Sequence, residues 1–501
     1  MKGLLSALAS RAWLAVALVG LVVVVLVFAL QLIPRLGAGQ DAIDAAKPAL
    51  TDERVAGDRA GIDFISKYVD LVDPLVTARG GGSREIATLI RIVTKKTRLS
   101  APQVAAALRK EAPHTEALLR ALPLSGVARE IPRLTGFLAT TLNLSEEELA
   151  AVVEQSFPKL AQTLTALLSV ASGWNDVPGT EGLTRFDGTT PVRTVPELRD
   201  YLREDLVATV ERNKDDFQDL AGRGGVGYIP WLLLVVGVVL LAFGLLQARR
   251  ATSAPPGRLA WSVVAVGVVI VGLVVVLQYF PRLNGADDVI ADLQPAFTEQ
   301  RVLGDRAGID MIHQTVLFGD PIATARGGGS AEVPMLVAFV SEKTNLSRAK
   351  VRAALRRQAP RIAAVLQAIP LSAVRAEIPH LVAFLSRTLK ISRDKLIATL
   401  RKRTPRLAQS ILAVRPVAHG WDEIPGTSKL TRFDGTPVRT MPALEDYFNK
   451  DVIPVLETQR GKFRDLAGPW PPVTYLPPLL IVVGALVTLC GLLMLRVATK
   501  R

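Results

Sequence analysis

Paired carboxylates are the residues of this 501-residue chain whose types and spacing come nearest to catalytic chemistry. Asp58 and Asp63 flank Arg59, and the same pattern returns at Asp305 and Asp310. Two carboxylates can act as a general acid and a general base. A five-residue spacing, however, does not bring both acids onto one face of a helix, and no histidine or nucleophile recurs beside them. The pattern therefore favours helix caps and ion pairs over catalysis.

Glycine-rich and tryptophan-containing segments also recur. Bare backbone N–H groups in the segments 79–83 and 326–330 (Arg-Gly-Gly-Gly-Ser) could surround an oxyanion. No Lys-Ser or Lys-Thr follows them in P-loop spacing, so a connection before the next helix is the favoured interpretation. Trp174 and Trp421 precede acidic turns that have too few ligands for an EF-hand, and we expect them to pack their turns onto helices.

The remaining reactive residues are few and scattered. Cys490 is the one cysteine, so an intramolecular disulfide is excluded, and the four histidines have no metal-ligand spacing. Neither a nucleophile–base constellation nor a nucleotide-binding fingerprint occurs. We predict a protein without catalytic residues, metal or cofactor, and not an enzyme.

The net charge of +14 is unevenly distributed. Residues 35–227 carry 24 basic and 27 acidic side chains, whereas residues 282–474 carry 28 and 19. In the second range, four arginines cluster on one helical region, either as a solvated face or as a contact for an anionic lipid, an anionic polymer or an acidic partner. These arginines are Arg352, Arg356, Arg357 and Arg361.

Four apolar stretches are long enough to cross a bilayer as helices. The predicted spans are 13–33, 229–247, 260–280 and 476–496. The first is too long for the core of a signal peptide and lacks an Ala-x-Ala site, so it is predicted to be an anchor.

The short segments that flank the spans set the orientation. Residues 1–12, 248–259 and 497–501 contain basic but no acidic side chains, which places them in the cytoplasm by the positive-inside rule. The large segments 34–228 and 281–475 are then extracytoplasmic domains of a multi-pass protein in the plasma (cytoplasmic) membrane. They face away from nucleic acid, and the composition suggests a bacterial envelope protein.

The chain is a tandem repeat with an offset of 247 residues, so each unit is a span, a domain and a span. A finer repeat of 45 residues lies inside each domain. Each such module contains a serine, apolar residues at helical spacing and a proline, which predicts a capped helix followed by a second helix. The serines are Ser100, Ser145, Ser347 and Ser392, and the prolines are Pro113, Pro158, Pro360 and Pro405.

One segment in each copy departs from this helical pattern. Residues 183–186, Asp187-Gly188 and residues 191–194 predict a small β-hairpin on a type I′ turn close to the membrane. The predicted fold class is therefore a mainly α membrane protein with four transmembrane helices, two duplicated helical domains and a small hairpin in each.

Glycines recur at matching positions within the spans and predict close helix packing. They are Gly20 and Gly267, Gly237 and Gly484, and Gly244 and Gly491.

Two functions remain open. One is a non-enzymatic envelope scaffold or accessory subunit that presents paired outer domains to membrane lipids and a protein partner. The other is an accessory component of a lipid or substrate transporter, because the spans lack the mid-membrane ionisable residues of a transport pathway. A protein that binds anionic lipid or polymer by itself is a third interpretation.

Overall fold

The computed structural model describes residues 2–221, 226–250, 257–276, 286–323, 328–466 and 475–499. These residues are mostly helical and contain no strand, so the prediction of a mainly α protein is confirmed for them. The chain divides into two compact units. Unit 1 comprises residues 1–55, 208–302 and 454–501, and unit 2 comprises residues 56–207 and 303–453. Each unit takes residues from both sequence copies, so the unit borders cut across the predicted domains 34–228 and 281–475.

Unit 1 contains the long apolar helices. By length and composition, three helices of the described residues could cross a membrane: Ile229–Arg250, Arg258–Val276 and Leu476–Arg496. Two bent helix pairs raise the number to as many as five. One is Trp13–Ala29 with Leu32–Ala46, bent by 55°, where Gln31 has a φ of 49°. The predicted span 13–33 therefore contains a break near its end.

The second bent pair, Pro360–Ala368 with Leu371–Leu389, has an angle of 83° and belongs to unit 2. It contains Glu377, whose carboxylate is hydrogen-bonded to another helix. We therefore assign this pair to the helical body of unit 2.

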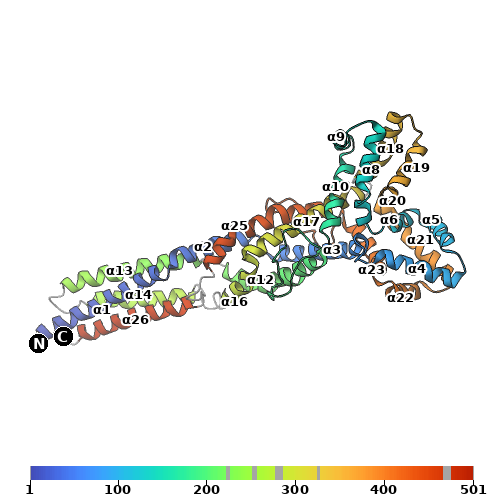
Figure 1. The fold of residues 1–501 in the computed structure, drawn as a ribbon. Helices are drawn as coiled ribbons and strands as arrows, with labels where there is room; N and C mark the ends of the chain where they lie inside the picture. The colour runs from blue at the N-terminus through green and yellow to red at the C-terminus, as the bar shows by residue number, and fades with distance from the viewer. Residues whose placement is uncertain are drawn as a thin grey trace. The chain divides into compact units, whose positions relative to one another are not determined.

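The apolar helices of unit 1 pack in pairs that follow the sequence copies (Figure 1). The helix α1 packs against α13, α14 packs against α26, and α1 also contacts α26. Their bounds are α1 (Lys2–Ala29), α13 (Ile229–Arg250), α14 (Gly257–Val276) and α26 (Leu476–Thr499).

Shorter helices complete unit 1 and link the two copies. Lys462 Nζ lies 3.2 Å from Asp41 Oδ2, and the rings of Phe297 and Phe463 stack with centroids 4.3 Å apart. The elements are α2 (Leu32–Ala46), α12 (Ala208–Leu220), η2 (Val226–Tyr228), α16 (Ala286–Leu293), η3 (Gln294–Phe297) and α25 (Ile453–Leu466).

Unit 2 is built from four equivalent groups of three helices, one for each predicted 45-residue module. Ser100, Ser145, Ser347 and Ser392 each accept a hydrogen bond from the backbone N–H three residues later, and each of the four prolines begins the next helix. The predicted serine caps and proline starts are confirmed. The helices are α4 (Gly82–Thr97), α5 (Ala101–Glu111), α6 (Pro113–Ala121); α8 (Ile131–Leu142), α9 (Glu146–Ser156), α10 (Pro158–Gly173); α18 (Gly329–Thr344), α19 (Arg348–Gln358), α20 (Pro360–Ala368); and α21 (Leu371–Leu389), α22 (Arg393–Arg403), α23 (Pro405–Gly420).

These groups pair across the copies into two arms. The first arm contains residues 82–121 and 371–420, and its core joins Leu89 and Val93 of α4 to Leu385 of α21 and Leu400 of α22. The second arm contains residues 128–173 and 329–368, where α18 packs against α8 and α10. Figure 1 shows the helices of each arm together. Each arm thus combines one module from each copy.

The rest of unit 2 consists of two long helices, two π-helical turns and short connecting helices. Tyr68 on α3 donates a hydrogen bond to the carbonyl of its own sequence equivalent, Thr315 on α17 (3.4 Å). The elements are α3 (Asp52–Val76), α7 (Ser125–Ala128), α11 (Val195–Asp200), η1 (Tyr201–Val207), α17 (Glu299–Ala323), α24 (Met441–Tyr447) and η5 (Phe448–Val452), with the first residues of α3 and α17 in unit 1.

The predicted β-hairpins are wrong. Each is reduced to one isolated antiparallel bridge, Thr184 with Pro191 and Thr431 with Pro437, and the described residues form no strand there. Proline has no N–H to continue a ladder, and the Asp187 side chain accepts the N–H groups of Thr189 and Thr190 instead. Gly188 has a positive φ of 73° but Asp187 does not, so the turn is not type I′.

Candidate functional site

Four carboxylates join the two copies at the starts of four helices. Glu377 accepts hydrogen bonds from the backbone N–H groups of His114 (3.0 Å) and Thr115 (2.8 Å) at the start of α6. Glu130 does the same for Arg361 (2.8 Å) and Ile362 (3.2 Å) at the start of α20. These N–H groups have no partner inside their own helices, and a carboxylate also complements the helix dipole.

The other two caps follow the same rule. Glu332 accepts from Lys159 and Leu160 at the start of α10, and Glu85 accepts from Arg406 and Leu407 at the start of α23. In every case the glutamate and the capped helix belong to different copies. The exchange is reciprocal within each arm, so neither copy satisfies these N–H groups alone.

Burial and hydrogen bonding have opposite effects on Glu377. Burial alone would raise the pKa of its carboxyl group. The hydrogen bonds from Thr115 and His114 lower the pKa, and their combined effect is larger than that of burial, so the pKa lies below its ordinary value. The His114 ring nitrogen Nδ1 is 2.6 Å from the same carboxylate. The capping site thus favours the charged form of Glu377.

Sequence reasoning missed these glutamates, although a signal for them exists. Glu85 and Glu130 are 45 residues apart, as are Glu332 and Glu377, and each pair repeats at the offset of 247. A charged residue that recurs at both the 45-residue and the 247-residue offset occupies the same position in every module. Such recurrence indicates a shared structural role.

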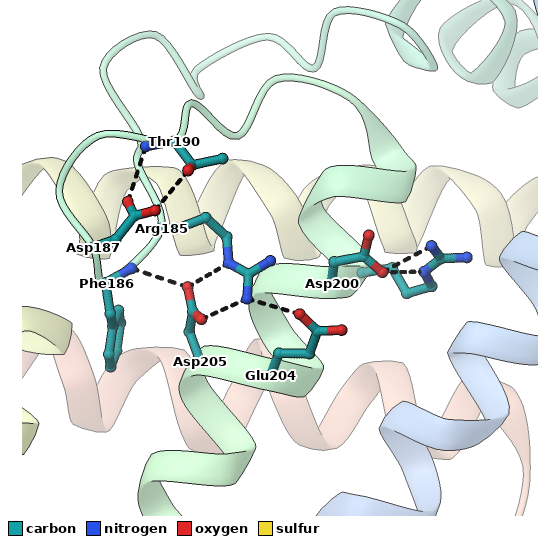
Figure 2. A network of polar contacts seen from close by, with 8 residues as sticks. Arg185, Phe186, Asp187, Thr190, Asp200, Glu204 and Asp205 are labelled. Carbon is teal, nitrogen blue, oxygen red and sulfur yellow. Dashed lines mark hydrogen bonds and ion pairs between the residues drawn. The ribbon is translucent and has the colours of Figure 1, made fainter.

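A second contact, formed within each copy, locks the turn segments onto helices. Figure 2 shows Arg185 between Asp205 and Glu204 of the π-helical turn η1, with Nε 2.7 Å from Asp205 Oδ2. Asp205 also accepts the backbone N–H of Phe186 (2.9 Å). The second copy repeats this arrangement with Arg432 and Asp451.

The charges in this network stabilise one another. The hydrogen bond to Asp205 raises the pKa of Arg185 and outweighs the effect of burial, so its guanidinium remains charged. Hydrogen bonds from Thr190 and Thr189 lower the pKa of the exposed Asp187. Both effects favour the charged forms of Arg185 and Asp187.

Leucines next to these turns fit against glycines on the opposite copy. A Cβ atom at Gly308 on α17 would lie 2.8 Å from Leu198, and one at Gly61 on α3 would lie 2.7 Å from Leu444. In the same way, Leu183 packs against Gly304, and Leu430 packs against Gly57. The repeated Gly-x-x-x-Gly spacing is thus a docking face, a role that the sequence analysis did not identify.

One carboxylate of the acid pairs, that of Asp63, forms ion pairs. Asp63 lies 3.3 Å from Arg203 and 4.0 Å from Arg59, its helical neighbour. Its counterpart Asp310 is exposed, whereas Asp305 is buried. This placement agrees with the ion-pair interpretation for Asp63.

The glycine-rich segment of the first copy presents carbonyl groups to a cation. Arg406 donates hydrogen bonds to the carbonyls of Arg79 and Gly80, each 2.9 Å long. Gly81 has a φ of 82° and precedes α4, so the segment is the predicted connection before a helix. Residues 326 and 327 of the equivalent segment lie outside the described residues, and Gly328, with a φ of 88°, precedes α18 in the same way.

Both tryptophans are buried and hydrogen-bonded. Trp174 Nε1 donates to Asp73 (2.9 Å), and Trp421 Nε1 donates to Asp320 (3.0 Å). They pack the turn segments onto α3 and α17, which agrees with the expected packing role.

The four arginines of the predicted anion contact lie on two consecutive helices. Arg352, Arg356 and Arg357 are exposed on α19. Arg361 is half-buried on α20, where its guanidinium lies against Gly126. Three of the four therefore face solvent from one helix.

The glycines of the predicted spans lie at the contacts between paired apolar helices. A Cβ atom at Gly237 would be 2.9 Å from Val24 of α1, and one at Gly244 would be 2.6 Å from the Ala17 backbone nitrogen. Gly20 faces Gly237 and Leu241. The copy-two residues Gly267, Gly484 and Gly491 repeat these contacts between α14 and α26.

No group of three or more histidine, cysteine, aspartate or glutamate side chains in the described ranges could hold a metal ion. A cavity of about 60 Å³ lies in unit 2 between Tyr68, Phe318 and Trp421, and its lining is apolar. Comparison with known proteins finds no family model, no curated relative and no solved structure that matches the chain.

Proposed function

We propose that this chain is a non-enzymatic membrane-anchored scaffold or accessory subunit of the cell envelope. The reciprocal glutamate caps are the observation that supports it most, because they make one body from both copies. The chain enters unit 2 twice and leaves it twice, so four connections tie this body to unit 1. Such a body suits the presentation of a fixed surface to a partner.

The proposed orientation places unit 2 outside the cytoplasmic membrane and both termini in the cytoplasm. Cysteine labelling tests it, in a Cys490→Ala background. Glu181 is exposed, whereas the adjacent Thr180 is buried, so Glu181→Cys is the outer probe and Ser253→Cys is the cytoplasmic one. We expect a membrane-impermeant maleimide to label only Glu181→Cys in intact cells, and Ser253→Cys after permeabilisation. The reverse pattern would overturn the orientation.

The scaffold function itself is tested by mild detergent extraction at native expression. We expect a protein partner to co-purify at a fixed ratio to the chain. A monodisperse chain without a partner, obtained from membranes where it is active, would contradict the proposal.

A transporter accessory is the second candidate, and a hollow on the α14–α26 pair favours it. Small side chains at Gly272, Ala485 and Thr488 form the hollow, and an apolar partner helix could fit there. Crosslinking from Gly272→Cys to a polytopic membrane protein would support this candidate over the first.

A further inference from the structure

The basic side chains of unit 2 are unevenly divided between its two arms. The first arm, residues 82–121 and 371–420, carries 18 basic and 5 acidic side chains, a formal charge of +13. The second arm, residues 128–173 and 329–368, carries 10 and 7, a formal charge of +3. The arms are built from equivalent helices, so packing alone does not require this difference.

Most carboxylates of the first arm are already used inside it. Glu85 and Glu377 cap helices, and Glu116 lies 3.5 Å from Arg109 and 3.6 Å from Arg120. Few acidic groups are therefore left to neutralise the surface of this arm.

Three cations form a line along α4. Arg84, Arg91 and Lys95 are exposed and fall within roughly 40° around the helix axis, at spacings of about 10 Å and 6 Å. The buried Leu89 and Val93 occupy the opposite side of the helix. The line is a track of positive charge and not an isolated pair.

The cations of α22 surround the exposed part of that helix. Arg393, Lys395, Arg401, Lys402 and Arg403 are all exposed and spread over an arc of roughly 280°. The side with the buried Leu396 and Leu400 is free of them. A flat membrane surface could reach a small part of this arc, whereas a flexible chain can follow it.

The apolar surface of the arm also argues against a membrane partner. Among the described residues of this arm, Leu412 is the single large hydrophobic side chain that is exposed. Insertion between lipid headgroups needs a whole apolar face, which one leucine does not provide. We propose that the first arm binds a flexible linear polyanion with repeating phosphate groups, which its arginines can contact in bidentate fashion. This inference rests on the proposed scaffold function and names the chemistry of one partner.

Binding to the full chain in non-ionic detergent tests the proposal, with long-chain inorganic polyphosphate as the probe. The variant Arg401→Gln/Lys402→Gln/Arg403→Gln is compared with Arg352→Gln/Arg356→Gln/Arg357→Gln on the equivalent helix α19. We expect the α22 variant to bind at least tenfold more weakly and to lower the slope of log affinity against log salt by about two. The α19 variant should change affinity less than twofold.

A second variant, Arg84→Gln/Arg91→Gln/Lys95→Gln, should weaken binding as the α22 variant does. Helical circular dichroism and melting of every variant should match the parent chain, because the changed side chains are exposed. Equal losses in the α19 and α22 variants, preference for anionic vesicles over polyphosphate, or no polyphosphate binding would each overturn the inference. A partner that still co-purifies under those outcomes would leave the scaffold proposal standing.

Discussion

The carboxylate of Glu377 accepts a 2.8 Å hydrogen bond from the backbone N–H of Thr115, a residue of the opposite sequence copy. Glu130 reaches Arg361 with the same length in the reverse direction. Because a helix start needs acceptors for its first N–H groups, each copy completes the helices of the other. The parts of the two copies that belong to unit 2 therefore depend on each other for their helix starts.

Removing one cap should destabilise this body measurably. Glu377→Ala leaves two backbone N–H groups and Thr115 Oγ1 without their acceptor, and we expect a loss of about 2 kcal/mol in the free energy of unfolding. Glu342→Ala removes an exposed carboxylate from α18 and should cost less than about 0.5 kcal/mol. Denaturant unfolding in detergent measures both. Equal effects would show that the cap contributes little.

Acid should weaken the same contact. The pKa of Glu377 is lowered in the folded chain, so its contribution is fully present above the ordinary carboxyl pKa. It is lost as the pH falls from there through the lowered pKa. The melting temperature of the parent chain should therefore fall more steeply with acid in this range than that of Glu377→Gln. Parallel curves would contradict the prediction.

The first half of the chain, residues 1–250, should not fold as a monomer. Its helices α6 and α10 would lack Glu377 and Glu332, which cap them in the full chain. A dimer could restore the contacts, since Glu130 and Glu85 are the equivalents of those residues. We expect either a protease-sensitive monomer or a folded dimer in analytical ultracentrifugation. A protease-resistant monomer would refute the exchange.

Local patterns in the sequence predicted local structure well. The repeated serine and proline define caps and helix starts, since these depend on neighbours within four residues. The pairing of modules depends instead on contacts such as Glu377 with Thr115, 262 positions apart, which no local pattern encodes. The hairpin failed for a related reason, because side-chain bonds from Asp187 and the missing N–H of Pro191 outweighed the turn signal. The charge difference between the copies was visible in the sequence, whereas the charge of each arm depends on which modules pair and so needs the structure.

Docking of the turn segment should be sensitive to a single methyl group. Gly308→Ala places a Cβ 2.8 Å from Leu198, so we expect a loss of about 1–3 kcal/mol from overpacking. Leu198→Ala in the same chain should recover part of it, measured by a double-mutant cycle. Gly136→Ala meets nothing closer than 4.0 Å and should be neutral or stabilising. Additive effects of the Gly308 and Leu198 changes would rule out their direct contact.

Packing of the first two apolar helices should depend on Gly244. A side chain there would meet the Ala17 backbone nitrogen at 2.6 Å, so Gly244→Leu forces α1 and α13 apart. Gly272→Leu on α14 is the matched control, because a Cβ there meets nothing within 4 Å. Both changes add the same apolar side chain to an apolar helix, so insertion into the bilayer should be equal.

A cysteine pair placed across α1 and α13, in the Cys490→Ala background, reports helix proximity through oxidative crosslinking. We expect the crosslink yield to fall several-fold for Gly244→Leu and to stay unchanged for Gly272→Leu. Equal yields in the two variants would mean that the helices tolerate bulk at this contact, and the glycine would then carry no role in their packing.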